Sequence, residues 1–125
     1  MPINGYQSIG KIMTKLFLDD IRYPYDPSWK VVRNFHEFKA FCDSYNPEGE
    51  GLVVSFDHDL ANEHYVSSGY TGPKIECNGE DCARYMIQSG IRPTAVIVHS
   101  WNPDGAKRIA QLFEDEGVYV TRKEY

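Results

Sequence analysis

The stretch Leu52–Asp59 reads LVVSFDHD and decides the fold of this chain. Its first five residues, Leu52–Phe56, are nearly all apolar and rich in β-branched side chains, which is typical of a strand covered on both faces in a parallel sheet. Three titratable residues follow at once, namely Asp57, His58 and Asp59. In an open α/β sheet, ligands bind outside the carboxyl ends of the strands. The stretch therefore predicts a central strand that delivers reactive side chains to a binding crevice.

Two other apolar runs end in the same way. Leu16–Leu18 leads into Asp19 and Asp20, and Thr94–Val98 leads into the sequence HSWN at 99–102. The carboxyl ends of parallel strands meet at one edge of a sheet, so we expect these side chains to share one crevice with Asp57. For any single acid, the alternative is a solvated turn residue that only marks the end of its strand.

Length and composition indicate one globular domain. The chain has 125 residues, of which 42% are hydrophobic and 25% charged, and this length suits a single core. The mean hydropathy is −0.49, and no apolar run approaches the roughly 18 residues that a membrane helix needs. We expect an N-terminal extension at 1–14, which lacks the apolar segment of a secretory signal, and one α/β domain at 15–125.

Cysteine usage and charge narrow the class of protein. The three cysteines form no zinc-type CxxC pair, which favours reduced thiols and a cytoplasmic location over a metal site at Cys77 and Cys82. The formal net charge of −5 argues against broad nonspecific binding to nucleic acid, which needs a basic surface.

Four acids would lie together in the predicted crevice, namely Asp19, Asp20, Asp57 and Asp59. Carboxylates so close to one another cannot all stay ionised without a cation or raised pKa values. Mg²⁺ or Mn²⁺ is the cofactor that this cluster predicts, because such ions prefer oxygen ligands.

The remaining patterns predict the order of the elements. Pro24 and Pro27 leave no room for a full helix after the first strand. Asn34, Asn78 and Asn102 are placed to cap three helices, which we expect to end near 45, 89 and 116. The order β-β-α-β-loop-α-β-α-β predicts a mostly parallel sheet with helices on both faces, with the first crossover helix replaced by a loop. The predicted strands are 15–18, 29–33, 52–56, 94–98 and 118–121.

Two segments are expected to border the crevice. The irregular stretch 61–78 contains Gly69, Gly72 and Pro73, and a loop of that length in a small domain is typical of a functional segment. We therefore expect a lid there. The helix capped by Asn102 should begin beside His99 and offer free backbone N–H groups to an anion.

This layout resembles the receiver domain of response regulators, which has a flavodoxin-like fold. In receivers, an acidic pair on the first strand and an acid at the end of the third hold magnesium, and the latter accepts a phosphoryl group. The resemblance places Asp19, Asp20 and Asp57 in those positions. Ser100 falls near the receivers' hydroxyl position, and Arg122 stands where they keep a lysine.

Three motifs together are more similar to a receiver-derived group, the cyclic-phosphate processing receiver domains. They are LFLDDIRYP at 16–24, SFDHDL at 55–60 and HSWNPDG at 99–105, and the resemblance extends over about residues 15 to 122. It implies a phosphoesterase-like activity on nucleotides or nucleic-acid ends that bear cyclic phosphates.

Two functions are compatible with these residues. In a metal-assisted phosphoesterase, His58 and His99 would move protons, with Asp57 and Asp59 beside them, because opening a cyclic phosphate needs a base for water and an acid for the departing ribose oxygen. In a signalling or partner-binding domain, Asp57 would be the phospho-acceptor, or the site would have no chemistry. Arg122 argues against ordinary signalling, because a planar guanidinium is not equivalent to an ammonium.

The predicted substrate-binding residues are Arg22, Ser100, Asn102 and Arg122. Arg22 follows an acidic strand end by two residues, so its guanidinium suits either a clamp on a phosphate oxygen or a structural salt bridge to one of those acids. The predicted partner is a phosphate-bearing nucleotide or RNA end, and no membrane partner is expected.

Overall fold

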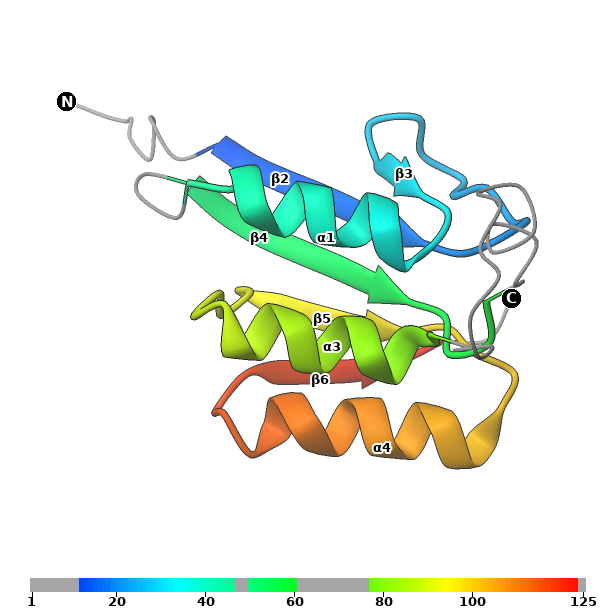
Figure 1. The fold of residues 1–125 in the computed structure, drawn as a ribbon. Helices are drawn as coiled ribbons and strands as arrows, with labels where there is room; N and C mark the ends of the chain where they lie inside the picture. Colours follow the sequence, from blue (N-terminus) through cyan, green and yellow to red (C-terminus); the bar gives the residue numbers. More distant parts are fainter. Residues whose placement is uncertain (1–11, 47–49, 61–76, 124–125) are drawn as a thin grey trace, which may run out of the picture.

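The computed structural model of the chain describes residues 12–46, 50–60 and 77–123 (Figure 1). The predicted order of strands and helices is confirmed. Most of the predicted lid, residues 61–76, lies outside the described residues, as do residues 1–11 of the predicted extension. The elements are β2 (Ile12–Leu18), β3 (Lys30–Val32), α1 (Phe35–Ser44), β4 (Glu50–Phe56), α3 (Gly79–Gln88), β5 (Ala95–Val98), α4 (Pro103–Glu114) and β6 (Tyr119–Arg122).

The five strands form one parallel sheet in the order β3-β2-β4-β5-β6. This confirms the predicted parallel α/β fold and the receiver-like arrangement, with the strand of the LVVSF run at the centre. β2 begins at Ile12, three residues before the predicted strand, and pairs with β4 from Ile12↔Glu50 to Leu18↔Phe56. The strand ends of β2 and β4 therefore lie side by side.

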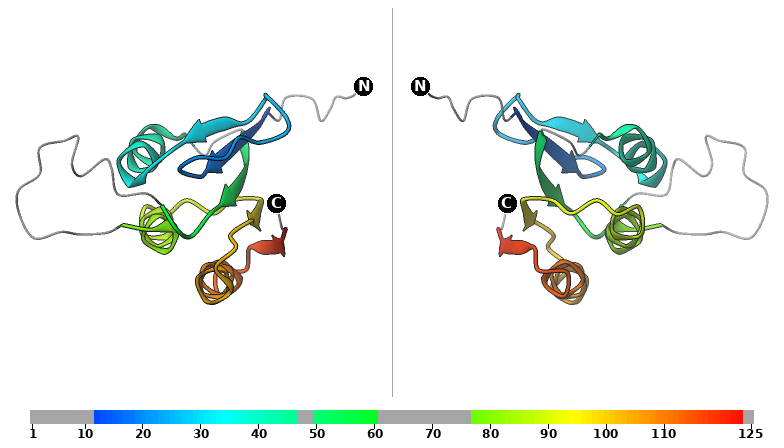
Figure 2. Two further views of the ribbon diagram at one scale, coloured as in Figure 1. Left: turned by 90° about the vertical axis from the view of Figure 1, so that its right-hand side faces the viewer. Right: turned by 90° about the vertical axis from the view of Figure 1, so that its left-hand side faces the viewer.

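The three helices of the described residues cover the same face of the sheet (Figure 2). Our expectation of helices on both faces is wrong, and the reason is topological. Crossovers between parallel strands are right-handed, and α1, α3 and α4 each join strands that step in the same direction along the sheet. Only the connection from β2 to β3 steps back, and this fully described connection has no helix, as its prolines predicted.

The hydrophobic core lies between the sheet and this helix layer. Alternate strand residues supply it from the sheet, and Phe56 at the end of β4 is fully buried between two helical rings. The ring centroid of Phe56 lies 5.6 Å from that of Phe38 in α1 and 5.3 Å from that of Phe113 in α4. The end of β4 is thus held firmly just before the Asp57-His58-Asp59 sequence begins.

The loop between β2 and β3 covers part of the opposite face of the sheet. Trp29 packs edge-on against Phe17, with 6.2 Å between ring centroids, and Lys15 pairs with Asp26 at 3.0 Å. Val53 in the middle of β4 stays half-buried on this face. The loop therefore takes the place of the missing helix at the end of the sheet where the strands finish.

The three predicted asparagine caps are confirmed. The side-chain oxygens of Asn34, Asn78 and Asn102 accept the backbone N–H groups of Glu37, Asp81 and Gly105 respectively. Such caps satisfy N–H groups that have no partner inside the helix. None of the helices in the described ranges is long and apolar enough to cross a membrane.

Candidate functional site

The residues that follow β2, β4 and β5 continue the pairing of the sheet. The Asp57 N–H donates to the Leu18 carbonyl at 3.0 Å, and the His99 N–H donates to the Phe56 carbonyl at 2.9 Å. Asp19, Asp57 and His99 are therefore held by main-chain hydrogen bonds at one edge of the sheet. As predicted, the strand ends bring these residues together.

Asp19, Asp20 and Asp57 form what we call the acid cluster. Each contributes a carboxylate oxygen, and these three oxygens lie within 4.8 Å of one another. Asp19 and Asp57 are buried and Asp20 is partly buried. Three carboxylate oxygens at this separation are the donor set of a hard divalent cation such as Mg²⁺ or Mn²⁺, so the residues present fit such an ion.

Asp19 is fully buried and accepts hydrogen bonds on both carboxylate oxygens. Oδ1 accepts the backbone N–H groups of Ile21 and Arg22 at 3.0 and 2.9 Å. Oδ2 lies 3.0 Å from Nη1 of Arg22 and 3.0 Å from Nε2 of His99. Burial alone would raise the pKa of Asp19, but these hydrogen bonds hold the pKa well below its usual range. Asp19 therefore stays ionised well below neutral pH.

The pKa of Asp57 moves in the opposite direction to that of Asp19. Burial, followed by the negative charge of Asp19, raises the pKa of Asp57 to about 6. His99, Arg22 and a hydrogen bond with the Ser100 side chain oppose this rise without cancelling it. Two neighbouring carboxyl groups with pKa values moved in opposite directions are typical of sites where a proton or a cation is exchanged.

Arg22 bridges the two buried acids. Its Nη1 atom lies 3.0 Å from Oδ2 of Asp19 and 3.9 Å from Oδ2 of Asp57. The salt bridge that we considered from the sequence is therefore present. The Arg22 side chain keeps 27% of its surface exposed, and its guanidinium lies 5.0 Å from the ring centroid of Trp101. Arg22 can thus reach a ligand at the surface while it holds the cluster.

Arg33 fixes the loop that carries Arg22. Its Nη1 atom donates to the carbonyl oxygens of Asp19 and Arg22 at 3.0 and 2.6 Å. Its guanidinium also lies 4.4 Å from the ring centroid of Tyr23. Nothing in the sequence alone marked Arg33, because its contacts depend on β3 ending beside β2.

His99 is inside the protein. Its ring is fully buried and stacks on Phe17 with 4.6 Å between centroids. Nδ1 lies 2.6 Å from the Ser55 hydroxyl, and Nε2 lies 3.0 Å from Asp19. An ionised carboxylate only accepts, so Nε2–H donates to Asp19, while Nδ1 and the Ser55 hydroxyl share the second hydrogen bond. The hydrogen bonds from Ser55 through His99 to Asp19 hold the Asp19 carboxylate in its orientation. Ser55 was not selected from the sequence, although a hydroxyl in an otherwise apolar strand was a usable signal.

His58 lies on the helix side of the strand end. Nδ1 lies 2.7 Å from Oδ1 of Asp59, and a Cβ atom added to Gly105 would come within 2.3 Å of the imidazole ring. The His58 carbonyl also accepts the N–H of Gly79 at 2.7 Å. Nε2 is buried and has no hydrogen-bond partner among the described residues. Asp59 accepts Nδ1–H, and in the neutral imidazole this tautomer carries its lone pair on Nε2.

Asn102 connects the Asp59–His58 pair to α4. Its Nδ2 atom donates to Oδ1 of Asp59 at 3.1 Å, while its Oδ1 atom accepts the Gly105 N–H at 2.9 Å. At the helix start that we expected to bind an anion, the Gly105 N–H is bonded to Asn102 and Pro103 has no N–H to offer, so the expectation stays a prediction that rests on fewer free N–H groups. Asn102 joins the helix cap to the Asp59–His58 pair.

The last two predicted residues have different surroundings. Ser100 is buried beside Asp57 and accepts the Asn102 N–H at 3.1 Å, so it lies within the site. Arg122 is exposed at the end of β6, where it pairs in register with Val98. It makes no ion pair with any residue that the structure describes. Arg122 therefore lies on the edge strand beyond β5, and its predicted role in substrate binding stays a prediction.

Comparison with known proteins gives one match. The family model of the Cyclic-phosphate processing Receiver domain matches residues 14–115. Neither a curated protein nor a solved structure shows a significant match.

Proposed function

The chain belongs to the cyclic-phosphate processing receiver domains, and from this premise we propose that it is a metal-assisted phosphoesterase that opens a cyclic phosphate on a nucleotide or an RNA end. The observation that carries the proposal is the acid cluster, with three carboxylate oxygens within 4.8 Å beside a partly exposed arginine. Phosphoester hydrolysis needs positive charge at the developing phosphoryl oxygens and a route for two protons. Both requirements have candidates in this site.

Asp19, Asp20 and Asp57 would hold one Mg²⁺ or Mn²⁺ ion. When bound, such an ion supplies Lewis-acid polarisation of a phosphoryl oxygen. Arg22 would bind a second phosphate oxygen, because its guanidinium already lies at the cluster and reaches the surface. Ser100, in contact with Asp57, would orient that carboxylate toward the phosphate.

Asp57 has a pKa of about 6 without a metal, so near neutral pH it would give up its proton on binding a divalent ion and stay ionised as a ligand. His58 is the group suited to move protons, because in its neutral form Nδ1–H donates to Asp59 and Nε2 carries the lone pair. The ring is covered in this structure, so this assignment requires that substrate binding uncover Nε2. We assign His99 a positioning task, because its two ring nitrogens contact Ser55 and Asp19.

A product assay tests the proposal. Purified protein with millimolar Mg²⁺ or Mn²⁺ is incubated with 2′,3′-cyclic nucleotides, and nucleoside monophosphate is quantified. We expect turnover that EDTA abolishes, that Asp57→Asn removes and that His58→Ala lowers by about 10²-fold or more. Asp104→Asn, a neutralised acid at the exposed start of α4, is the matched control and should keep wild-type activity. Absence of product from the wild type with either metal would contradict the proposal.

The signalling alternative has one observation in its favour. Ser100 hydrogen bonds with Asp57, as the resemblance to receivers requires of a hydroxyl next to a phospho-acceptor. Incubation with acetyl phosphate and Mg²⁺ distinguishes the two functions. A stable mass gain of one phosphoryl group that Asp57→Asn abolishes, without turnover of cyclic nucleotides, would favour signalling.

A further inference from the structure

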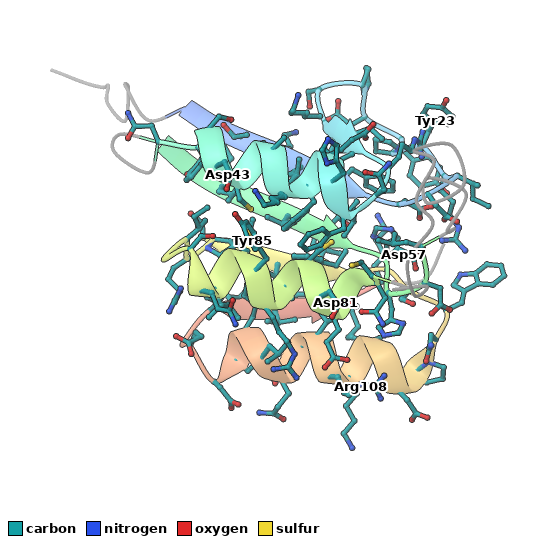
Figure 3. The ribbon with its side chains drawn as sticks, viewed as in Figure 1. Tyr23, Asp43, Asp57, Asp81, Tyr85 and Arg108 are labelled. Carbon is teal, nitrogen blue, oxygen red and sulfur yellow. The ribbon has the colours of Figure 1, made fainter. Side chains whose placement is uncertain are left out.

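Exposed apolar side chains gather at the end of the sheet that carries the acid cluster. Six large hydrophobic residues of the described chain are strongly exposed. Four of these follow β2 or β5 in the loops at the strand ends, namely Ile21, Tyr23, Tyr25 and Trp101, with exposed fractions of 71%, 74%, 83% and 67%. Figure 3 shows Tyr23 and Asp57 at this same end. Apolar side chains concentrated in this way mark binding surfaces.

Two of these aromatic rings are held by the arginines of the site. The Arg22 guanidinium lies 5.0 Å from the Trp101 ring centroid, and the Arg33 guanidinium lies 4.4 Å from that of Tyr23. Cation–π contacts of this kind are worth about 0.5–1 kcal/mol at exposed sites and restrict the ring. Because Arg22 also reaches Asp19 and Asp57, Trp101 is fixed next to the predicted phosphate position.

We propose that Trp101 stacks against the nucleobase of the substrate, which makes the substrate a nucleoside cyclic phosphate and not a cyclic phosphate without a base. The proposal rests on the proposed function for the position of the phosphate. Exposed aromatic rings bind bases of any identity because every base has a π-face. The site should therefore require a base and discriminate weakly among bases.

The charge of the protein supports stacking as the source of affinity. A chain with a formal net charge of −5 gains little from attraction to a long phosphate backbone. Stacking does not depend on net charge, and Arg22 then needs to satisfy only one phosphate group. This arrangement fits a mononucleotide or the last nucleotide of an RNA better than an internal stretch of strand.

Fluorescence titration tests the proposal without requiring turnover. The chain has two tryptophans, so Trp29→Phe leaves Trp101 as the only indole while keeping an aromatic ring against Phe17. The probes are adenosine 2′,3′-cyclic phosphate and the 2,3-cyclic phosphate of methyl ribofuranoside, both with Mg²⁺. We expect quenching by the nucleotide alone and an affinity about 5-fold to 150-fold higher for the nucleotide. Calorimetry on the wild type repeats the comparison without the Trp29 substitution.

Variants separate stacking from a structural contribution. Trp101→Ala should lower the affinity for the nucleotide to that for the base-free probe and leave the latter unchanged, whereas Trp101→Phe should recover part of the loss. Tyr119→Ala removes an aromatic ring that is equally exposed, at 68%, but lies at the start of β6, and it should change neither affinity. Equal loss for both probes in Trp101→Ala would overturn the proposal.

The outcomes distinguish this inference from the proposed function. Base-dependent binding without product supports stacking and contradicts hydrolysis. Turnover of both probes with equal KM supports hydrolysis and overturns stacking. If neither probe binds, both the stacking inference and the proposed function are overturned.

Discussion

Replacing Asp57 with asparagine is expected to stabilise the metal-free protein at pH 8. The folded state raises the pKa of Asp57 from 3.8 to about 6, so the folded state holds the proton more tightly than the unfolded chain does. Well below pH 3.8 the group is protonated in both states and costs nothing. As the pH rises from 4 to 6, the unfolded chain ionises first and stability falls. Above pH 6 the buried charge destabilises the wild type by roughly 3 kcal/mol.

The asparagine variant lacks this charge and should be more stable by that amount at pH 8, with an advantage of only about 0.5 kcal/mol at pH 4. For a domain of this size, roughly 3 kcal/mol corresponds to about 10 °C in Tm. Mg²⁺ should reverse the order at pH 8, because an ion that binds the native state raises the Tm of the wild type and gains less from the variant. The measurement is the Tm of the wild type and of Asp57→Asn at pH 4 and at pH 8. Each Tm is measured with EDTA and again with millimolar MgCl₂.

Asp26→Asn is the matched control. Asp26 is exposed on the same loop as Arg22, so removing its charge should neither stabilise the protein at pH 8 nor change the response to Mg²⁺. The reasoning would be refuted if Asp57→Asn lowered the Tm at pH 8 in EDTA, because Asp57 would then be a stabilising carboxylate in the absence of metal. An identical Mg²⁺ response in the wild type and Asp57→Asn would remove Asp57 from the metal site.

Two further substitutions test the two sides of the site. Ser55→Ala leaves Nδ1 of the buried His99 without its hydroxyl partner, so we expect the free energy of unfolding in urea to fall by about 1–3 kcal/mol. Ser55→Thr keeps the hydroxyl and should lose less. Equal losses in the two variants would contradict a stabilising Ser55–His99 hydrogen bond. Gly105→Ala places a methyl group within 2.3 Å of the His58 ring, so we expect a loss of about 1–3 kcal/mol despite the better helix propensity of alanine. Ala110→Gly is the control, because it changes helix propensity in the same helix without a clash. A gain in stability from Gly105→Ala would contradict the prediction, because the His58 ring would then move aside freely.

The strand ends could be predicted because burial and chemistry change at the same residue. The apolar run before Asp57 and the one before Asp19 each stop where a carboxylate begins, and parallel pairing then brings the two acids together. The prolines after β2 likewise predicted a connection without a helix. These features depend on local sequence and on one rule of sheet topology, which is why they were confirmed.

The placement of the described helices on one face of the sheet could not be predicted from strand composition alone. A parallel strand such as β4 is apolar at most positions whether helices lie on one face or on both. The distribution of helices follows from the order of the strands, since three crossovers step one way and only one steps back. That order is set by long-range pairing, and the sequence pattern carries no direct sign of it.

The alternation of side chains along β4 places Asp57 and His58 on opposite sides of the strand end. Successive residues of an extended chain point to opposite faces, so Asp57 shares the side of Ser55, while His58 turns toward α4 and meets Gly105. The acid cluster and the Asp59–His58 pair therefore flank the end of β4 on its two sides. A cyclic phosphate that contacts Arg22 at the cluster can exchange a proton with His58 only if its ribose passes over the end of β4. The nucleobase would then have to leave the phosphate toward the loop that carries Trp101, because that loop connects β5 to the same α4 helix that covers His58.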